Sequence, residues 1–345
     1  MPDGYGAEMI NSLPVAVAVL LVGGAFLLIT GIRFTRTVDV LADRTGIGEA
    51  LAGAVLLGAA TSLPGLITTI TGALEGEAGF AVSNAIGGIA AQTSFLVIAD
   101  LIYRRTNLEH AAASLPNLLQ TAILIALVGT VLMAATGPEF SILGVHPASA
   151  ALVLVYVYGL RLVRGAGESP MWRPRDTADT DVDVIDDDDD DPNTTTKLWL
   201  EFAGLAAVVA VVGYLIGQAG LTVARESGMS GSIVGALFTS VITSLPELIT
   251  VLTAVRIGAL TLAVSNIVGG NTFDVLFVAA ADLAFRGGSI YHAVDQQTLL
   301  VLAVTVVMTA MLTGGLLYRD ERYIGFEGIA ILGTYAVGIA GLVAL

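Results

Sequence analysis

The pentapeptide TSLPG at 61–65 returns as TSLPE at 243–247, and both copies lie inside long apolar stretches of this 345-residue chain. Adding 182 to a position in the first region gives its counterpart in the second without a gap, and 19 of the 41 pairs from Thr61 to Leu101 are identical. Chance similarity between two apolar helices would not keep one register through prolines, asparagines and aspartates. The sequence therefore predicts an internal duplication.

The composition indicates a membrane protein. Hydrophobic residues make up 55% of the chain and its mean hydropathy is +0.83, well above the values of soluble domains. About 20 apolar residues cross roughly 30 Å of hydrocarbon as a helix. We therefore predict an all-α integral membrane protein with ten transmembrane helices. The predicted spans are about 13–33, 45–74, 79–103, 113–135, 142–164, 197–217, 229–256, 260–285, 296–318 and 324–344.

The spans and the duplication divide the chain into three parts. Residues 1–164 are predicted to form a first five-helix repeat, 165–196 an acidic cytoplasmic linker, and 197–345 a second five-helix repeat. Because five is an odd number, the second repeat enters the membrane in the opposite sense, which makes an inverted-topology repeat. With both termini outside a cell membrane, the cytoplasmic side carries 13 of the 15 Lys and Arg residues. That bias is typical of cytoplasmic loops.

The composition also excludes several kinds of site. The chain has no cysteine, which excludes disulfides and thiolate chemistry, and its three histidines are scattered. Much of the net charge of −15 lies in the stretch 176–192, which we expect to be a solvated linker, with cation sensing as the alternative. No basic patch is present to meet nucleic acid. The acid-rich, lysine-poor composition resembles that of proteins from halophiles.

Both TSLP segments lie near the middle of a predicted span. Proline removes one backbone N–H and clashes with the carbonyl four residues earlier, so each helix should break or kink there. The freed carbonyls and the adjacent hydroxyls are oxygen ligands suited to hard cations. A single kink could be structural. Two kinks at symmetric positions, each beside an Asn- and Gly-rich span, are typical of secondary transporters.

Two carboxylates stand out inside the predicted spans. Glu247 directly follows the second TSLP proline, and Asp274 lies near the middle of the next span. A carboxylate in hydrocarbon is costly unless it is paired, protonated or bound to a cation, so both residues indicate a functional site. Asp100 and Asp282 lie instead at span ends beside arginines, and we predict that they form anchoring pairs there.

The segments SVITSLPELITVLTA at 240–254 and AVSNIVGGNTFDVLF at 263–277 resemble the second α-repeat of the sodium/calcium exchanger family, within the cation/calcium antiporter superfamily. The resemblance extends to both repeats, the ten spans, the outside N-terminus and the cytoplasmic loop. It implies an antiporter and not an enzyme, with Ca²⁺ and Na⁺ as transported ions and no organic cofactor. By this resemblance the ion path is lined by Thr243, Ser244, Glu247, Asp274 and the backbone carbonyl near Ser240.

The first repeat departs from that family pattern. Gly65 stands where the family has a glutamate, and Gln92 stands where the partner helix has Asn or Asp. Thr61 and Ser62 are retained, and we include them with Gln92 in the predicted metal site. With two acids the site carries at most two negative charges, which match one Ca²⁺ or two monovalent cations or protons.

These features favour a secondary-active antiporter that exchanges Na⁺ for Ca²⁺ by alternating access, with the ions bound at mid-membrane between the TSLP segments. The first and sixth spans would slide against the bundle that holds the site. The alternatives are a monovalent cation/proton antiporter of the same fold and a non-transporting cation-binding homologue. A hydrolase is disfavoured because no nucleophile is recognisable. The expected partners are the lipid bilayer and the cations, without nucleic acid, and a monomer is compatible with the sequence.

Overall fold

The computed structural model describes residues 10–45, 61–103, 107–168, 194–257, 260–318 and 324–345. Apart from an isolated bridge between Ile142 and Val145, all regular secondary structure in these residues is helical. This confirms the predicted all-α class. Apolar segments favour helices in hydrocarbon because a helix satisfies its own backbone N–H and C=O groups. The predicted linker lies outside the described residues over 169–193.

The helices fall on either side of that linker. Those of the first half are α1 (Leu13–Thr45), α4 (Leu63–Leu74), α5 (Ala78–Tyr103), α6 (Leu108–Ala111), α7 (Leu115–Thr136) and α8 (Pro147–Glu168). Those of the second half are α9 (Thr195–Ser227), α10 (Gly231–Val234), the π-helix η2 (Gly235–Thr239), α11 (Ser240–Thr243), α12 (Leu245–Ile257), α13 (Leu260–Asp274), α14 (Leu276–Ala284), the 3₁₀-helix η3 (Ile290–His292), α15 (Gln296–Tyr318) and α16 (Phe326–Ala344).

Eight helices within the described residues are long and apolar enough to cross a membrane. A ninth span would be the bent pair Gly231–Thr243 and Leu245–Arg256. These nine correspond to all the predicted spans except the second. Of that span the structure describes the shorter apolar helix α4, while 46–60 lie outside the described residues. The count of ten therefore stays a prediction.

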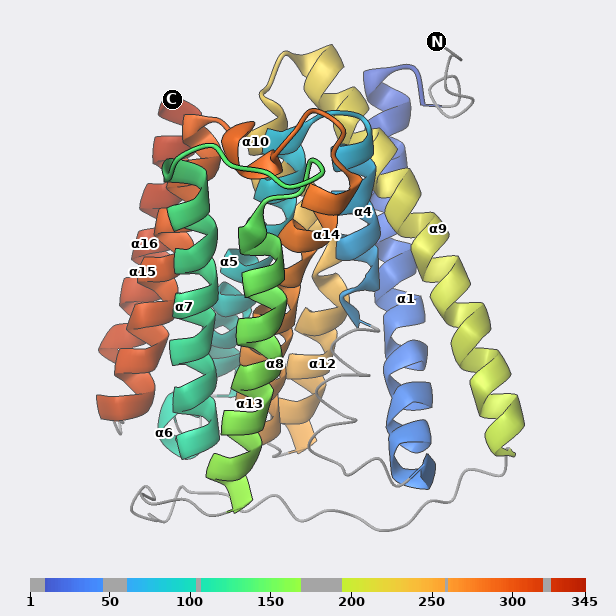
Figure 1. Cartoon of the computed structure of the whole chain (residues 1–345). Coiled ribbons are helices and arrows are strands. Elements are labelled where there is room, and N and C mark those ends of the chain that lie inside the picture. Colours follow the sequence, from blue (N-terminus) through green and yellow to red (C-terminus); the bar gives the residue numbers. More distant parts are fainter. Residues whose placement is uncertain (1–9, 46–60, 104–106, 169–193, 258–259, 319–323) are drawn as a thin grey trace.

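Helix α5 lies in the middle of the bundle (Figure 1). It packs against α4, α13, α15 and η2, and every residue from Phe80 to Val97 is buried. Alanine, glycine and serine make up much of this stretch, so neighbouring backbones can approach on all sides. The helix that carries Gln92 is therefore held rigidly at the centre of the molecule.

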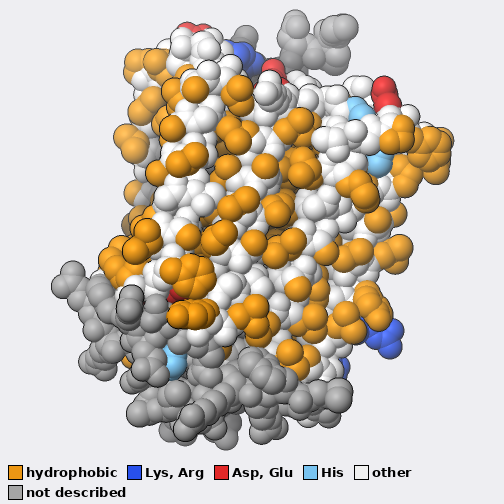
Figure 2. Space-filling model, turned by 90° about the vertical axis from the view of Figure 1, so that its left-hand side faces the viewer, with side chains coloured by type: hydrophobic (Ala, Val, Ile, Leu, Met, Phe, Trp, Pro, Cys, Tyr) orange, Lys and Arg blue, Asp and Glu red, His pale blue; other side chains and the backbone are white. Residues whose placement is uncertain are grey.

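The outer surface of the bundle is apolar. Hydrophobic side chains are spread over the part of the face in Figure 2 that lies above the residues drawn in grey. Side chains that are between 68% and 73% exposed include Leu21, Val22, Ile29, Leu154, Leu200, Ile329 and Val337. A continuous apolar belt of this height marks a membrane-facing surface. The chain is thus a multi-pass membrane protein.

Helices α1 and α9 lie side by side at one edge of the bundle (Figure 1). A Cβ atom on Gly31 of α1 would lie 2.9 Å from Cβ of Pro246, and one on Gly213 of α9 would lie 2.7 Å from the carbonyl oxygen of Pro64. Both the glycines and the prolines are 182 residues apart. Each long helix therefore rests against the TSLP proline of the other half at a distance that only glycine allows.

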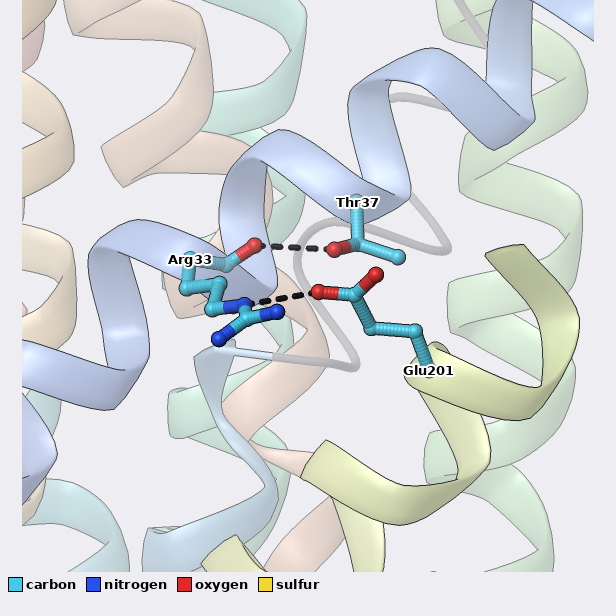
Figure 3. A network of polar contacts seen from close by, with 3 residues as sticks. All are labelled: Arg33, Thr37 and Glu201. Carbon is cyan, nitrogen blue, oxygen red and sulfur yellow. Dashed lines mark hydrogen bonds and ion pairs between the residues drawn. The ribbon is translucent and has the colours of Figure 1, made fainter. Parts of the chain in front are cut away.

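One polar contact ties α9 to α1, and a second ties the other end of α9 to Ile10, which precedes α1. The Nε of Arg33 donates to Oε1 of Glu201 at 2.7 Å, and the carbonyl of Arg33 accepts from the Thr37 hydroxyl at 3.0 Å (Figure 3). At the other end, the Thr222 hydroxyl donates to the carbonyl of Ile10 at 2.9 Å. The Arg33 side chain is 72% exposed, so this ion pair contributes about 0–1 kcal/mol. Its main effect is to fix the register of the two helices.

Asp282 and Asp100 anchor the connections that follow their helices. Oδ1 of Asp282 accepts from the backbone N–H of Ile290 at 3.0 Å, and Oδ1 of Asp100 accepts from that of Leu108 at 3.0 Å. The two bonds are related by the same offset of 182 that relates the TSLP segments. Both carboxylates are buried, so each bond satisfies a backbone donor that would otherwise cost free energy.

The predicted ion pair of Asp282 with an arginine is wrong. Its Oδ2 accepts from the backbone N–H of His146 at 2.8 Å and from the Ser149 hydroxyl at 2.7 Å, and Arg286 makes no ion pair with it. Full burial explains the difference, because backbone amides and a hydroxyl can reach a buried carboxylate without desolvating a guanidinium. The arginines predicted to pair with Asp100 lie at 104–105, outside the described residues.

Candidate cation-binding site

The second TSLP segment breaks its helix, as the sequence predicts. Helix α11 ends at Thr243 and α12 begins at Leu245, and the two parts of the span are bent by 45°. Pro246 cannot donate a backbone hydrogen bond. One turn earlier, the carbonyl of Ser240 accepts from the backbone N–H of Ser244 at 3.1 Å and from the Thr243 hydroxyl at 3.2 Å. The turn therefore exposes the side chains that follow it to the interior of the bundle.

Two other helix ends meet this turn. Helix α4 begins at Leu63, with Pro64 in its first turn, so the first TSLP segment also starts a new helix. Helix α13 ends at Asp274 and α14 starts at Leu276, which interrupts the eighth span. No proline marks this second interruption, and the sequence did not predict it. Asp274 therefore lies at a helix end, where its side chain is directed into the same region as Glu247.

A cavity lies where these helix ends meet α5. It leaves about 10 Å³ for the centre of a water-sized sphere, and its lining residues are Ser62, Gly65, Asn84, Ala85, Gly88, Gln92, Thr243, Ser244, Glu247, Asp274 and Phe277. Six of the eight residues predicted for the metal site are among them. Thr61 and Ser240 are buried beside the cavity but do not line it.

Neutral donors hold one oxygen of each carboxylate. The amide nitrogen of Gln92 donates to Oδ2 of Asp274 at 2.8 Å and to the Ser244 hydroxyl at 3.3 Å. The Ser62 hydroxyl donates to Oε1 of Glu247 at 3.3 Å. The first half of the chain thus supplies the donors, and the second half supplies the acids.

The second oxygen of each carboxylate and the amide oxygen of Gln92 have no hydrogen-bond partner among the described residues. The three unpartnered atoms that line the cavity are Oε1 of Gln92, Oε2 of Glu247 and Oδ1 of Asp274. All three side chains are at most 3% exposed. Buried polar atoms are nearly always paired, because an unpaired one costs free energy. Three unpaired oxygens in one cavity indicate that its ligand is positively charged and binds to oxygen atoms.

The chemistry of these atoms fits a hard cation. Carboxylate, amide and hydroxyl oxygens are the ligands that Ca²⁺ and Na⁺ take, whereas sulfur and nitrogen ligands are missing from this lining. Within the described residues, no group of three or more Asp, Glu and His side chains is placed to share a metal ion. A cation in the cavity would be held by two carboxylates and by neutral oxygens.

The position of the missing acid is filled by an aromatic ring. A Cβ atom on Gly65 would lie 3.3 Å from Cε2 of Phe277 and 3.6 Å from the hydroxyl of Thr243. Phe277 is held edge-on against Phe273, with ring centroids 5.8 Å apart, and Phe273 meets Tyr156 at 6.0 Å. Of these three rings, Phe277 lines the cavity and forms its wall beside Gly65, together with the Thr243 hydroxyl.

Five of the lining residues were not among those predicted for the site, and two of them, Phe277 and Asn84, make specific contacts. Phe277 could not be found, because only the fold brings it beside Gly65. Asn84 lies in the repeated AVSN segment, which could have identified it. Its side chain binds the carbonyl of Gly65 at 3.2 Å, the Thr69 hydroxyl at 2.9 Å and the Thr239 hydroxyl at 2.6 Å. Asn84 therefore ties α5 to both halves.

Comparison with known proteins relates this architecture to membrane antiporters. The family model described as "Sodium/calcium exchanger protein" matches residues 15–164 and 197–344. A relative described as "Putative antiporter CaxA", from Alkalimonas amylolytica, is 26% identical over 315 residues, which are 90% of this chain and 94% of the relative.

Two solved structures share the fold. One is the sodium-calcium exchanger NCX_Mj soaked with Na⁺ and Sr²⁺, at 18% identity and a TM-score of 0.60, with 95% of this chain and 99% of that chain covered. The other is native YfkE, at 14% identity and a TM-score of 0.64, with 99% of this chain and 95% of that one covered.

Proposed function

Because this chain belongs to the sodium/calcium exchanger family, we propose that it is a cation antiporter that exchanges Na⁺ for Ca²⁺ by alternating access. The membrane-spanning helices hold the ions near the middle of the bilayer, in the cavity between the two TSLP segments. Ca²⁺ and Na⁺ are the transported substrates, and no organic cofactor takes part.

The single observation that supports this proposal best is the set of three unpartnered oxygens in the cavity, on Gln92, Glu247 and Asp274. A cation that enters the cavity gains these ligands together with two negative charges. Ca²⁺ normally takes six to eight oxygens, and the hydroxyls of Ser62, Thr243 and Ser244 or retained waters complete the set. Because neutral hydroxyls or waters would complete the coordination, the ion could be released again, as transport requires.

The proposed architecture is a pair of inverted five-helix repeats with ten spans. Two structural correspondences at the offset of 182 support it: the bonds of Asp100 and Asp282, and the contacts of Gly31 and Gly213 with the opposite prolines. Helix α1 begins and α16 ends at the same end of the bundle (Figure 1), as an even number of crossings requires. The excess of basic residues in the predicted cytoplasmic loops favours outside termini and a cytoplasmic linker.

Alternating access in this scheme is a movement of the α1–α9 pair across the TSLP turns. The contacts of Arg33 with Glu201 and of Thr222 with Ile10 join the two helices into one body. Gly31 and Gly213 present no side chain to the prolines on which they rest, so little steric resistance opposes sliding. Ions would then reach the cavity from one side of the membrane at a time.

A monovalent cation/proton antiporter of the same fold is the second candidate function. The observation that favours it is Gly65, since the first half adds no carboxylate to the cavity and Ca²⁺ affinity falls as ligand charge is removed. A non-transporting homologue is less well supported, because a chain released from transport gains nothing by burying Glu247 and Asp274.

Radiocalcium uptake into proteoliposomes tests the proposal. Vesicles loaded with Na⁺ are diluted into Na⁺-free buffer, and uptake is compared among the wild type, Glu247→Gln and Glu226→Gln. Glu226 is an exposed carboxylate outside the cavity and serves as the matched control. We expect uptake that needs the Na⁺ gradient and is lost only in Glu247→Gln. Exchange of Na⁺ or protons without calcium uptake would favour the second candidate, and no flux of any cation would favour the non-transporting homologue.

A further inference from the structure

We propose that the connection between α7 and α8 is a membrane anchor whose apolar tip inserts into the interface of the outer leaflet. This connection, residues 137–146, lies at the same end of the bundle as the end of α16 (Figure 1). None of its residues lines the cation cavity. The outer leaflet follows from the orientation proposed above, whereas the insertion itself does not depend on which ions are exchanged.

The connection forms a two-residue hairpin with an unusual turn. The backbone N–H of Ile142 donates to the carbonyl of Val145 at 2.9 Å, and that of Val145 donates to the carbonyl of Ile142 at 3.1 Å. The two residues between them, Leu143 and Gly144, have φ angles of 54° and 82°. Turns of this kind favour Asn-Gly or Gly-Gly, because both central residues are left-handed. Leucine is unfavourable for the turn itself, so its apolar side chain needs another explanation.

The tip of this hairpin exposes apolar side chains. Phe140 and Ile142 are 57% and 59% exposed, and Leu143 is 100% exposed. The whole connection contains one acid, Glu139, and no lysine or arginine. In water, these three side chains would forgo the free energy that removal of apolar surface from water provides. The tip therefore fits surroundings that are apolar.

The fold does not require an apolar connection at this place. With the offset of 182, residues 137–141 correspond to 319–323, which read RDERY and contain four charged residues. Each of these segments follows the fourth predicted span of its repeat. The same architecture thus carries a charged connection on one side of the membrane and an apolar one on the other. The apolar character of 137–146 is a property of this connection and not of the repeat.

The hairpin starts at the edge of the hydrocarbon. Helices α7 and α8 each contain 22 residues and are about 33 Å long, close to the roughly 30 Å of hydrocarbon. Met133, one turn before the end of α7, is 68% exposed and belongs to the apolar belt. Hydrophobic side chains project sideways from the bundle at the upper right of Figure 2, on the side where this connection lies. The tip is therefore continuous with the membrane-facing surface.

Polar contacts hold the base of the hairpin in place. The backbone N–H of His146 donates to Oδ2 of Asp282 on α14 at 2.8 Å, and Nε2 of His292 lies 3.2 Å from the carbonyl oxygen of Gly137. The ring of His146 also packs on that of Tyr291, with centroids 5.1 Å apart. Both ends of the connection are thus fixed to α14 and η3. Insertion of the tip would hold this end of α8 and α14 against the bilayer.

A lipid interface fits this tip better than a second copy of the chain. Specific protein interfaces bury about 1,000 Å² or more, which is far beyond what three side chains at a hairpin tip supply. An interfacial segment needs only apolar residues such as Phe and Leu at the boundary between headgroups and acyl chains. Because the connection has no lysine or arginine, its contact with lipid is apolar and not an attraction to anionic headgroups.

Site-directed labelling tests the insertion directly, because the chain contains no cysteine. The single variants Leu143→Cys, Leu154→Cys and Glu226→Cys are labelled with the fluorophore NBD and placed in phosphatidylcholine nanodiscs, which leave both membrane faces accessible. Leu154 lies on α8 within the apolar belt, and Glu226 is an exposed carboxylate near the end of α9. Quenching is measured with nitroxide-labelled lipids and with iodide in the water.

We expect nitroxide lipids to quench the label at position 143 by at least about half, and a nitroxide near the headgroup to act more strongly than one at the chain end. The label at position 154 should respond more to the deeper nitroxide, and that at position 226 to iodide alone. A label at position 143 that iodide reaches and lipids do not quench would overturn the insertion. Shielding from both quenchers would also overturn it, because protein would then cover the tip.

A variant of the same hairpin separates the effect of the side chains from that of the label. Phe140→Ser with Ile142→Ser removes two apolar side chains and keeps the backbone bonds between Ile142 and Val145. Lipid quenching of the label at position 143 should then fall by about threefold or more. Ser141→Ala is the matched control and should leave the quenching unchanged. Undiminished quenching in the double variant would overturn the proposal, because the fluorophore and not the hairpin would then insert.

Discussion

In the first copy of the TSLP motif, Gly65 and Gln92 occupy the positions at which the second copy has Glu247 and Asp274. Both copies still form a helix start at the same place and face one cavity. The first copy supplies donors and an amide oxygen, and the second supplies both negative charges. The two copies of a duplicated segment can thus share one backbone geometry while only one copy supplies the negative charge that binds the ion.

The repeated asparagines differ in the same way. Asn84 of the first copy uses its side chain in three hydrogen bonds that join α5 to α4 and η2. Its counterpart Asn266 has an amide nitrogen without a hydrogen-bond partner among the described residues. The asparagine of the first copy therefore joins helices to one another, whereas the asparagine of the second copy has a side-chain nitrogen that is not used in this way.

A third difference lies at the ends of the two copies. The loop anchored by Asp100 places Glu109 and Glu327 near that carboxylate, whereas the loop anchored by Asp282 has Tyr291 and Ser149 around it. Glu109 and Glu327 are at most 2% exposed. The copy without an acid in the cavity thus has an additional buried acid, Glu109, at its far end, close to Glu327 of the second half.

Loss of the acid in the second copy should have the largest effect. Glu247→Gln removes one of the two acids that a bound Ca²⁺ would meet, and Ca²⁺ affinity falls as ligand charge is removed, so we expect at least about a 100-fold loss of calcium transport. Gly65→Ala changes the aligned position without removing a charge and should stay within about threefold. Equal losses in the two variants would mean that the halves contribute equally to the site.

The amide of the first copy should matter less than the acid of the second. Gln92→Leu leaves Oδ2 of Asp274 without its amide donor and removes one of the free oxygens. An unsatisfied buried acceptor costs about 1–3 kcal/mol, which predicts calcium binding that is roughly 5- to 150-fold weaker by calorimetry. Gln120→Leu, on α7 outside the cavity, is the control. Unchanged affinity in Gln92→Leu would show that the first copy contributes no ligand.

Substitutions at the glycines through which α1 and α9 contact the TSLP prolines should have a smaller effect, and that effect should be on the rate of transport. Gly213→Ala places a methyl group 2.7 Å from the backbone oxygen of Pro64, while Gly31→Ala meets Pro246 at Cβ, 2.9 Å away. Backbone yields less easily than a ring carbon, so Gly213→Ala should slow transport more, at a cost of about 1–3 kcal/mol. Calcium binding should be retained in both. Gly204→Ala, whose Cβ meets nothing within 4 Å, is the control on the same helix.

The buried acid at the end of the first copy should affect stability and not transport. Burial, with Asp100 and Glu327 nearby, raises the pKa of Glu109 from 4.5 to about 8. The folded state then binds more protons than the unfolded state between these values, so stability falls as pH rises from about 4.5 to about 8. In Glu109→Gln this fall should shrink, and the variant should melt at least about 2–4 °C above the wild type at pH 9.

The measurement for that last prediction is thermal unfolding in detergent at pH 5, 7 and 9. Glu226→Gln, which changes an exposed carboxylate, should follow the wild type at every pH. A melting temperature of Glu109→Gln that tracks the wild type throughout would mean that Glu109 is not a source of the pH dependence.

The sequence predicted the parts of the fold that depend on covalent chemistry. Pro246 predicted the break at Ser244, because its missing N–H is a local property. The interruption at Val275 follows no proline and depends on packing among α13, α14 and their neighbours. For the same reason the wall that Phe277 makes beside Gly65 could not be predicted.

Adjacent hydroxyls show the limit of the site prediction. Thr61 and Ser62 both carry an oxygen, yet only Ser62 lines the cavity. The carbonyl of Ser240, predicted as a ligand, is engaged by Ser244 and Thr243 within the turn. The residue types were predictable, whereas their directions and local bonds required the structure.

In the proposed site, one cation lies between the neutral first copy and the acidic second copy. A crystal structure with Ca²⁺, read by anomalous scattering at long wavelength, tests it most directly. We predict a single peak about 2.3–2.6 Å from Oε2 of Glu247 and Oδ1 of Asp274, with Oε1 of Gln92 in the same shell. A peak elsewhere, for example beside Asp100 and Glu327, or a cavity that holds only water at saturating Ca²⁺, would contradict the account.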